Sequence, residues 1–186
     1  MSNTAPNAIL DPTGRAPVQR DAAGAPRAAR RADLAGARIG LLENTKHNAD
    51  LMLDEIGALL VAEHGAAAVT LRRTKRAFAL PAPEELIAEF AAQCDVVITG
   101  VGDCGSCSAS AVADGVVFEA AGVPAAVVCS DAFVTTANAM AELRGAPGYA
   151  YATTAHPVAV LTPEQVADRA KHLVADVVGL LTDAGR

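Results

Sequence analysis

Short apolar runs alternate with stretches of helical periodicity along most of this chain. Each apolar run has the length expected of a buried strand, and each periodic stretch gathers apolar side chains on one face of a helix. The apolar runs cover residues 37–42, 68–71, 95–101, 125–129 and 158–161. The helical stretches cover about residues 51–63, 83–94, 104–121, 132–144 and 162–180.

This alternation predicts an α/β fold, a three-layer α/β/α arrangement with a mostly parallel, flavodoxin-like sheet. In such sheets ligands bind beyond the carboxyl ends of the strands. We expect four loops to leave that edge and to converge on one pocket. They are residues 44–48, 103–108, 129–133 and 153–156.

Residues 1–35 form a different kind of segment, rich in Ala, Pro and Arg, which predicts a flexible N-terminal extension. One piece departs from this pattern, because an apolar pair at Ile9 and Leu10 precedes a turn sequence ending at Gly14. That piece is a candidate to dock on the body. Residues 36–186 are expected to form a single α/β domain.

The composition and charge narrow the class of protein. Apolar residues make up 52% of the chain but aromatic ones only 3%, so the core must consist mainly of Ala, Val, Leu and Ile. A net charge of −6 argues against a nucleic-acid partner. There is no secretory signal and no apolar stretch of the roughly 18 residues that a membrane span needs. We therefore expect a cytoplasmic protein without a membrane partner. The sequence does not decide whether the protein forms a homo-oligomer.

Four cysteines lie in the middle of the chain, and two of them, Cys104 and Cys107, form a C-x-x-C sequence. This is not the spread framework of a secreted disulfide protein, and it favours redox or metal chemistry. The pair follows a buried strand and a glycine-containing turn, at the expected start of a helix, where N–H groups favour a thiolate. Cys104 is the expected nucleophile, and Cys107 is expected to resolve its product as a disulfide.

Polar side chains on the neighbouring loops are the candidates for binding a substrate. The loop of residues 44–48 offers amides, a hydroxyl and a cation at a helix start, which suits a carboxylate or phosphate. Asp103 could act as a base or hold a hydroxyl, although its charge opposes thiolate formation, and His156 is either an acid–base group or a structural one. The candidate binding residues are Asn44, Thr45, Lys46, Asn48, Asp103, Ser106, Ser108 and His156.

Other uses of the two thiols remain open at this point. Cys104, Cys107, Cys129 and His156 together would supply a Cys3His set suited to zinc, but only the first pair has ligand spacing. The pair could also be inert. Neither a dinucleotide-binding fingerprint nor a P-loop occurs in the sequence, so no cofactor is expected.

Several of these segments together resemble the UGSC family, bacterial proteins some of which carry selenocysteine at the first position of the motif. The matching segments are the Leu-Leu-x-Asn-Thr-Lys-x-Asn loop at 41–48, the Gly-Asp-Cys-Gly-Ser-Cys-Ser segment at 102–108, His-Pro at 156–157 and the Ile-Leu-Asp-Pro-Thr piece that begins at Ile9. The exchange of selenocysteine for cysteine implies that position 104 is catalytic, because selenium is useful as a nucleophile and redox centre. The resemblance implies no particular reaction.

A looser similarity links the chain to aspartate/glutamate and hydantoin racemases, which also pair an Asn-Thr loop with a cysteine after a later strand. Those enzymes usually employ two cysteines from two half-chains, whereas the loop at 44–48 has none. A one-sided isomerase or lyase step, with Cys104 moving a proton, is the alternative to redox chemistry. The leading hypothesis is a thiol-dependent, oxidoreductase-type enzyme for a small, carboxylate-bearing substrate, with a thiol reductant as its partner.

Overall fold

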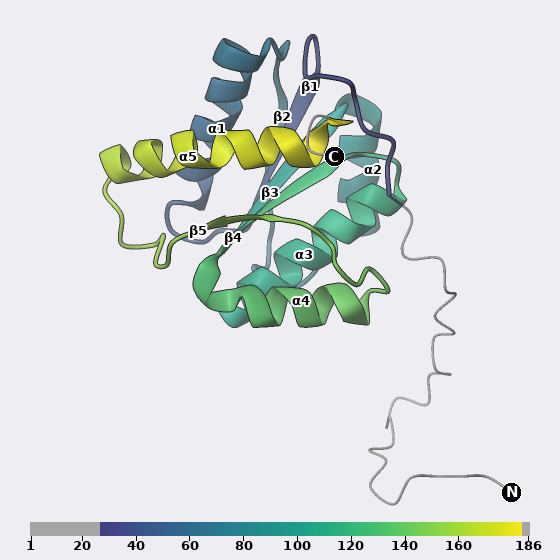
Figure 1. Cartoon of the computed structure of the whole chain (residues 1–186). Coiled ribbons are helices and arrows are strands. Elements are labelled where there is room, and N and C mark those ends of the chain that lie inside the picture. Colours follow the sequence, from purple (N-terminus) through teal and green to yellow (C-terminus); the bar gives the residue numbers. More distant parts are fainter. Residues whose placement is uncertain (1–26, 184–186) are drawn as a thin grey trace, which may run out of the picture.

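The computed structural model describes residues 27–183 of the chain. A five-stranded sheet lies between two layers of helices (Figure 1). The strands are β1 (Arg38–Glu43), β2 (Ala68–Thr74), β3 (Val96–Gly102), β4 (Ala125–Ser130) and β5 (Ala152–Thr154). The helices are α1 (Ala49–His64), α2 (Glu84–Gln93), α3 (Gly105–Ala120), α4 (Val134–Leu143) and α5 (Pro163–Leu181), with a short 3₁₀ turn, η1 (Asp131–Phe133), before α4.

The strand order is β2-β1-β3-β4-β5, and every neighbouring pair is parallel. This is the flavodoxin-like order of a doubly wound sheet. The predicted fold class is therefore confirmed. In this order β1 and β3 lie side by side, which brings the loops that follow them together at the carboxyl edge.

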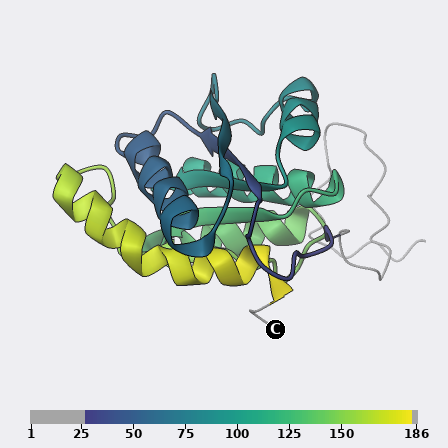
Figure 2. The same cartoon turned by 90° about the horizontal axis from the view of Figure 1, so that it is seen from above.

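Helices cover both faces of the sheet, as Figures 1 and 2 show from two directions. One face packs against α1 and α5 through an aliphatic core that includes Ile56, Ile98 and Leu173. The other face packs against α2, α3 and α4 through two smaller clusters, one around Phe90 and Phe118 and one around Val127. Since β3 is buried along its whole length, the residues that follow it have a rigid base.

The fifth strand lies earlier in the sequence than predicted. The prediction placed it at residues 158–161, but β5 is Ala152–Thr154 and residues 158–161 form a turn. In that turn the Val158 N–H donates to the carboxylate of Asp103, and its carbonyl accepts from the side-chain amide of Asn48. Only Val158 of this apolar segment is fully buried, and the segment bonds to side chains of neighbouring loops instead of a strand.

The last residues of the expected N-terminal extension pack against the domain. Arg30 forms two hydrogen bonds with the carboxylate of Glu119, near the end of α3, and both side chains of this ion pair are buried. The same carboxylate accepts from the N–H groups of Ala28 and Ala125. Residues 28–34 therefore belong to the folded body, which corrects the expected boundary at residue 35. The docking piece expected at residues 8–14 lies outside the described residues.

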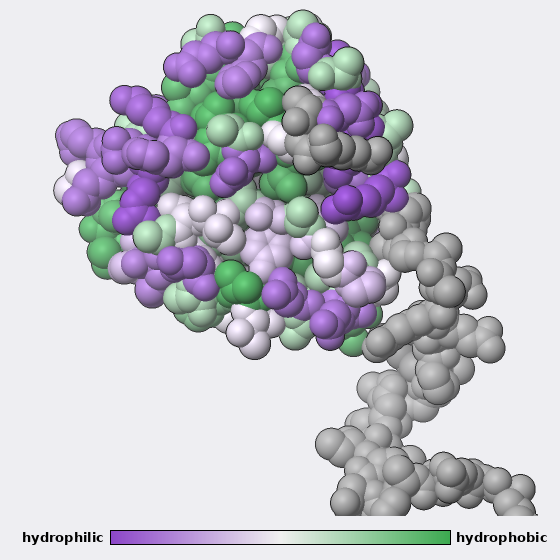
Figure 3. Space-filling model, in the orientation of Figure 1, coloured by the Kyte–Doolittle hydropathy of each residue, from purple (hydrophilic) through white to green (hydrophobic). Residues whose placement is uncertain are grey.

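The exposed surface mixes hydrophilic and hydrophobic residues, as Figure 3 shows for the face that carries α5. Large apolar side chains are exposed on α1 (Val61), in the loop between β2 and α2 (Phe78 and Leu80), at the end of α4 (Leu143) and in the turn before α5 (Val160). Exposed apolar residues of this kind are ordinary. Within residues 27–183, no helix has the length and apolar character needed to span a membrane.

Candidate functional site

A tight strand-to-helix turn delivers the two cysteines to the carboxyl edge of the sheet. β3 ends at Gly102, and a Cβ atom there would stand 2.7 Å from both the Ser108 hydroxyl and the Cys129 sulfur. Only glycine therefore allows the first turn of α3 to pack this closely on β4. Cys104 is the N-cap of α3 and Cys107 lies in its first turn.

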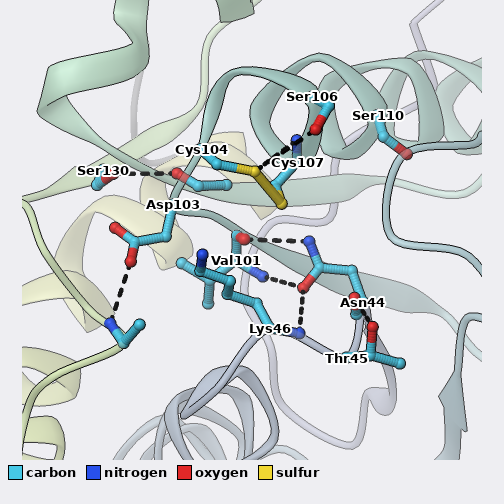
Figure 4. The surroundings of a disulfide bond; sticks show 12 residues. Asn44, Thr45, Lys46, Val101, Asp103, Cys104, Ser106, Cys107, Ser110 and Ser130 are labelled. Carbon is cyan, nitrogen blue, oxygen red and sulfur yellow. Dashed lines mark hydrogen bonds between the residues drawn. A yellow bond between two sulfur atoms is a disulfide. The ribbon is translucent and has the colours of Figure 1, made fainter.

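Cys104 and Cys107 form a disulfide, with their Cα atoms 5.1 Å apart (Figure 4). The Cys107 N–H donates to the sulfur of Cys104 at 3.2 Å, and the Ser106 hydroxyl lies 3.6 Å from the same sulfur. Cys107 is only 1% exposed, whereas Cys104 is half-buried. In the reduced protein these N–H and O–H groups, together with the helix dipole, would favour a thiolate at Cys104.

Asn44 lies beside this turn, but its amide group is occupied. Its Nδ2 donates to the Val101 carbonyl at 3.0 Å, and its Oδ1 accepts from the Val101 N–H at 3.1 Å. The side chain is 1% exposed. Asn44 therefore fixes the end of β3 below the disulfide, as Figure 4 draws it, and both ends of its amide are used.

The rest of the loop between β1 and α1 is held by a hydrogen bond within the loop and by two to the turn before α5. Thr45 has a φ of 64° and Asn48 a φ of 67°, both in the left-handed region. The Thr45 hydroxyl donates to the Asn44 carbonyl at 2.6 Å, and Asn48 donates to the carbonyls of Val158 and Leu161, each at 3.0 Å. A β-branched residue at positive φ is strained, and such strain gathers at functional sites.

Lys46 differs from its neighbours in this loop. Its side chain is half-buried, and its ammonium group has no hydrogen-bond or ion-pair partner among the described residues. Its backbone N–H points to the Oδ1 of Asn44 at 3.4 Å, so the loop that carries it is tied to Val101. Lys46 is therefore the group of this loop that is free to meet an anion.

Asp103 faces away from the thiols and toward the loop between β5 and α5. Its carboxylate accepts from the N–H groups of Val158 (3.1 Å) and Ala159 (3.0 Å). It also contacts Nδ1 of His156 at 2.9 Å. Burial by itself raises the pKa of this carboxyl, but these hydrogen bonds, with one from Ser130, outweigh it and leave the pKa below its ordinary value. Asp103 is therefore an ionised anchor for the loop that carries His156.

His156 is fixed from several sides. Its backbone N–H donates to the carboxylate of Asp131 at 3.0 Å. Its Nδ1 lies 3.3 Å from the Ser130 hydroxyl and also contacts Asp103. Its ring packs edge-on against Phe133, with the ring centroids 5.2 Å apart. The side chain is 37% exposed. The structure thus pairs His156 with Asp103, two predicted site residues that are 53 positions apart.

Ser108 and Cys129 lie beneath the site instead of lining it. Ser108 is fully buried, and its hydroxyl has no hydrogen-bond partner that meets ordinary geometry in the described part of the chain. Burial raises the pKa of the Cys129 thiol to about 12, although contacts with Ser108 and Gly102 oppose this. Both side chains fill the space around Gly102.

The predicted zinc alternative is not supported. Between residues 27 and 183, no group of three or more His, Cys, Asp or Glu side chains could hold a metal ion. Cys104 and Cys107 bond to each other, Cys129 is buried near Ser108, and His156 faces Asp103. The structure therefore does not assemble the Cys3His set, and that prediction is wrong.

Sequence reasoning missed a buried ion pair next to the thiols. The Lys75 ammonium contacts Asp114 at 2.5 Å and the Ser110 hydroxyl at 2.6 Å, and the two charged side chains are at most 3% exposed. Ser110 and Asp114 lie on α3, one and two turns beyond Cys107. The available signal was Asp114 itself, an acid within an otherwise apolar helical stretch, which needs a cation when buried.

The fold and the site together define a flavodoxin-like α/β protein with a thiol–disulfide pair at the start of a helix. The model of the UGSC family matches residues 8–183, so this chain belongs to the UGSC family. A solved structure of a flavodoxin-like domain from a Synechococcus sp. protein is similar over 78% of this chain and 94% of that chain, with 18% identity and a TM-score of 0.40. No curated protein matches the chain.

Proposed function

We propose that this protein is a thiol-dependent enzyme in which Cys104 attacks the substrate and Cys107 resolves the product. The observation that carries the proposal is the Cys104–Cys107 pair at the N-cap of α3, with one sulfur half-buried and the other enclosed. A nucleophile must be reached by its substrate, whereas a resolving thiol must only be reached by the nucleophile. This difference in exposure matches the two roles.

The redox cycle is a thiol–disulfide exchange. The Cys104 thiolate attacks one sulfur of a small disulfide; a Cys104–substrate disulfide forms, and the first half of the substrate leaves with the electron pair and takes up a proton. Cys107 then loses its proton and attacks the Cys104 sulfur, which releases the second half as a thiol. The substrate gains two electrons and two protons, and the two cysteines end as the disulfide. Thiols from a reductant return the enzyme to its dithiol form by the reverse exchange.

Lys46 supports a substrate that carries a carboxylate. It is the unpaired cation of the loop between β1 and α1, and that loop is tied through Asn44 and Val101 to β3, the strand that precedes the cysteines. The start of α3 adds N–H groups that favour negative charge. An anionic group bound between them would lie next to Cys104.

Trapping of the intermediate tests the proposed roles. The probe is dithiobis(nitrobenzoate), an aromatic disulfide that carries two carboxylates. We expect reduced wild-type protein to release two thiolates per chain and to end as the disulfide. Cys107→Ser should release one and hold the other half on Cys104, as seen by mass spectrometry. Cys104→Ser should react at least tenfold more slowly. A Cys104→Ser variant that reacts at the wild-type rate would contradict the assignment of the nucleophile.

The anion-binding role of Lys46 has its own test. Lys46→Gln should slow the reaction with the dianionic probe about tenfold, since a charge-assisted contact is worth roughly 1.5 kcal/mol. The reaction with dithiodipyridine, an uncharged aromatic disulfide, should keep its rate. Lys171→Gln, which removes a charge from the exposed part of α5, is the matched control. Equal slowing with both probes would show that Lys46 does not bind the carboxylates of the probe.

The isomerase or lyase alternative is separated by the same variants. If Cys104 only moves a proton, Cys107 has no role as a resolving thiol. The two cysteines would then stay reduced in a mild oxidant. Cys107→Ser would also give the same result as the wild type with dithiobis(nitrobenzoate). Either result would replace the redox cycle with proton transfer.

A further inference from the structure

We propose that His156, held by Asp103, is the acid of the exchange reaction and gives a proton to the group that leaves the substrate. This inference rests on the proposed function, because it needs Cys104 to be the nucleophile. It adds an acid–base pair to a site otherwise made of two thiols and a cation.

The pair lies at the same edge of the sheet as the nucleophile, with the Asp103 carboxylate directed toward the loop between β5 and α5. Asp103 follows β3 and immediately precedes Cys104, Ser130 is the last residue of β4, and His156 follows β5. These three strands are neighbours in the sheet, so the three loops meet at one edge. His156 therefore comes from the far side of the same edge from which Lys46 approaches.

The hydrogen bonds decide which ring nitrogen can act. Nδ1 of His156 lies 2.9 Å from Asp103 and 3.3 Å from the Ser130 hydroxyl. Asp103 is ionised, so Nδ1 carries the proton in this contact and Nε2 is the nitrogen left for a ligand. The carboxylate is buried while the imidazole is 37% exposed. A buried carboxylate that orients a partly exposed histidine is the arrangement of a histidine prepared for proton transfer.

The proton transfer completes the first step of the exchange. As the Cys104 sulfur bonds to one sulfur of the substrate, the sulfur–sulfur bond of the substrate breaks and the leaving sulfur takes the electron pair. The imidazolium gives its Nε2 proton to that sulfur and becomes neutral. Water restores the proton through the exposed side of the ring. The carboxylate of Asp103 stays ionised throughout.

Other titratable or charged groups lie around His156 and also affect a pH profile of the reaction. Asp131 accepts the backbone N–H of His156 from the 3₁₀ turn after β4. Arg169 on α5 donates to the Ala155 carbonyl at 2.7 Å. His47, from the loop between β1 and α1, contacts the Ala159 carbonyl at 2.6 Å. A pH profile therefore needs the His156 variant for comparison.

The leaving group supplies a test that a purely structural histidine would not pass. An alkyl thiolate is a poor leaving group without a proton, whereas an aromatic thiolate leaves unaided. The two probes are hydroxyethyl disulfide and dithiodipyridine, both uncharged. We expect His156→Gln to slow the first step at least a hundredfold with the alkyl probe and less than threefold with the aromatic one. The wild-type rate with the alkyl probe should fall at high pH, and this fall should be absent in the variant.

The controls separate this inference from the function on which it rests. Asp103→Asn should cause a smaller loss with the alkyl probe only, and His172→Gln, on the exposed face of α5, should change neither rate. Equal slowing of both probes by His156→Gln would make His156 structural and overturn the inference. If reduced wild-type protein reacts at Cys104 with neither probe, the proposed function fails instead. A thermal melt of each variant, with an unchanged midpoint expected for His156→Gln, confirms that it is folded.

Discussion

The four cysteines occupy two kinds of environment, although they are the same residue type. Cys94 and Cys129 are free and buried, and burial raises the pKa of both thiols. Cys104 and Cys107 stand at a helix start, with an N–H group directed at the outer sulfur. Reactivity toward electrophiles depends on the thiolate, so the two pairs should react very differently.

This difference predicts the pattern of alkylation in the folded, reduced protein. Iodoacetamide at about pH 8 should label Cys104 first and Cys107 more slowly. Cys129, with a pKa of about 12, holds roughly a thousandth of the thiolate of an ordinary cysteine and should react only after unfolding. Cys94 should also be protected, because it is buried. Peptide mapping by mass spectrometry over time gives the order, and early labelling of Cys129 would contradict it.

The identity of the candidate residues was readable from the sequence, but their partners were not. Cys104 stands out by its spacing and by its place after an apolar run. The hydrogen bonds between the Asn44 side chain and the Val101 backbone join residues 57 positions apart, and they form only because β1 and β3 are neighbours. The contact of Asp103 with His156 needs the position of β5, which was placed too late in the sequence. Long-range partners of this kind follow from the sheet, and local patterns do not contain them.

At the level of elements, the loop between β2 and α2 is joined to α3 by buried polar contacts. Lys75 reaches Asp114 and Ser110 on α3. In return, Asp114 accepts from the Ala82 N–H at 2.6 Å and Ser110 donates to the Leu80 carbonyl at 2.8 Å. The loop is thus fixed to the helix that begins with the two cysteines. Burial raises the pKa of Asp114 while the cation of Lys75 opposes the shift, so each charge depends on the other.

Breaking this pair should strongly destabilise the protein. Lys75→Met leaves the carboxylate of Asp114 buried without its cation, and the free energy of unfolding should fall by about 3–5 kcal/mol. Replacing both residues, with Lys75→Met and Asp114→Leu, should recover most of this loss because no charge stays buried. Denaturant unfolding measures both effects. The matched control is Arg73→Met, which removes the exposed ion pair with Glu89 and should cost less than about 1 kcal/mol.

The strands and helices with a clear hydrophobic period were predicted well. The error concerns the fifth strand, which was predicted at residues 158–161 but is Ala152–Thr154. Residues 158–161 look like a short buried strand because all four are apolar, although only Val158 is fully buried and Val160 is exposed. Their backbone groups, however, bond to Asp103 and Asn48, both from loops at the edge of the sheet. A short apolar run therefore shows neither that every residue in it is buried nor which groups satisfy its backbone. The true strand, Ala152–Thr154, is too short and too polar to stand out.

At the scale of the whole molecule, the sheet and its two helical layers supply the stability of the fold. The larger core joins α1 and α5 to the sheet, and two further clusters join α2, α3 and α4 to its other face. The buried N-terminal segment adds the Arg30–Glu119 ion pair at the far end of α3. Neither Cys104 nor Cys107 belongs to one of these clusters. We therefore expect that the domain does not need the disulfide to hold it together.

Reduction of the disulfide should accordingly change the stability of the protein only slightly. The bond links residues three positions apart, and a loop this short removes little entropy from the unfolded chain, about 2 kcal/mol at most. For a chain of this size the midpoint of thermal unfolding should fall by roughly 4–8 °C or less on reduction. Scans with and without a dithiol reductant measure the shift, and Cys104→Ser combined with Cys107→Ser should match the reduced protein. If the reduced form instead loses its cooperative transition, the bond is a structural link, and a cycle that opens it in every turnover becomes untenable.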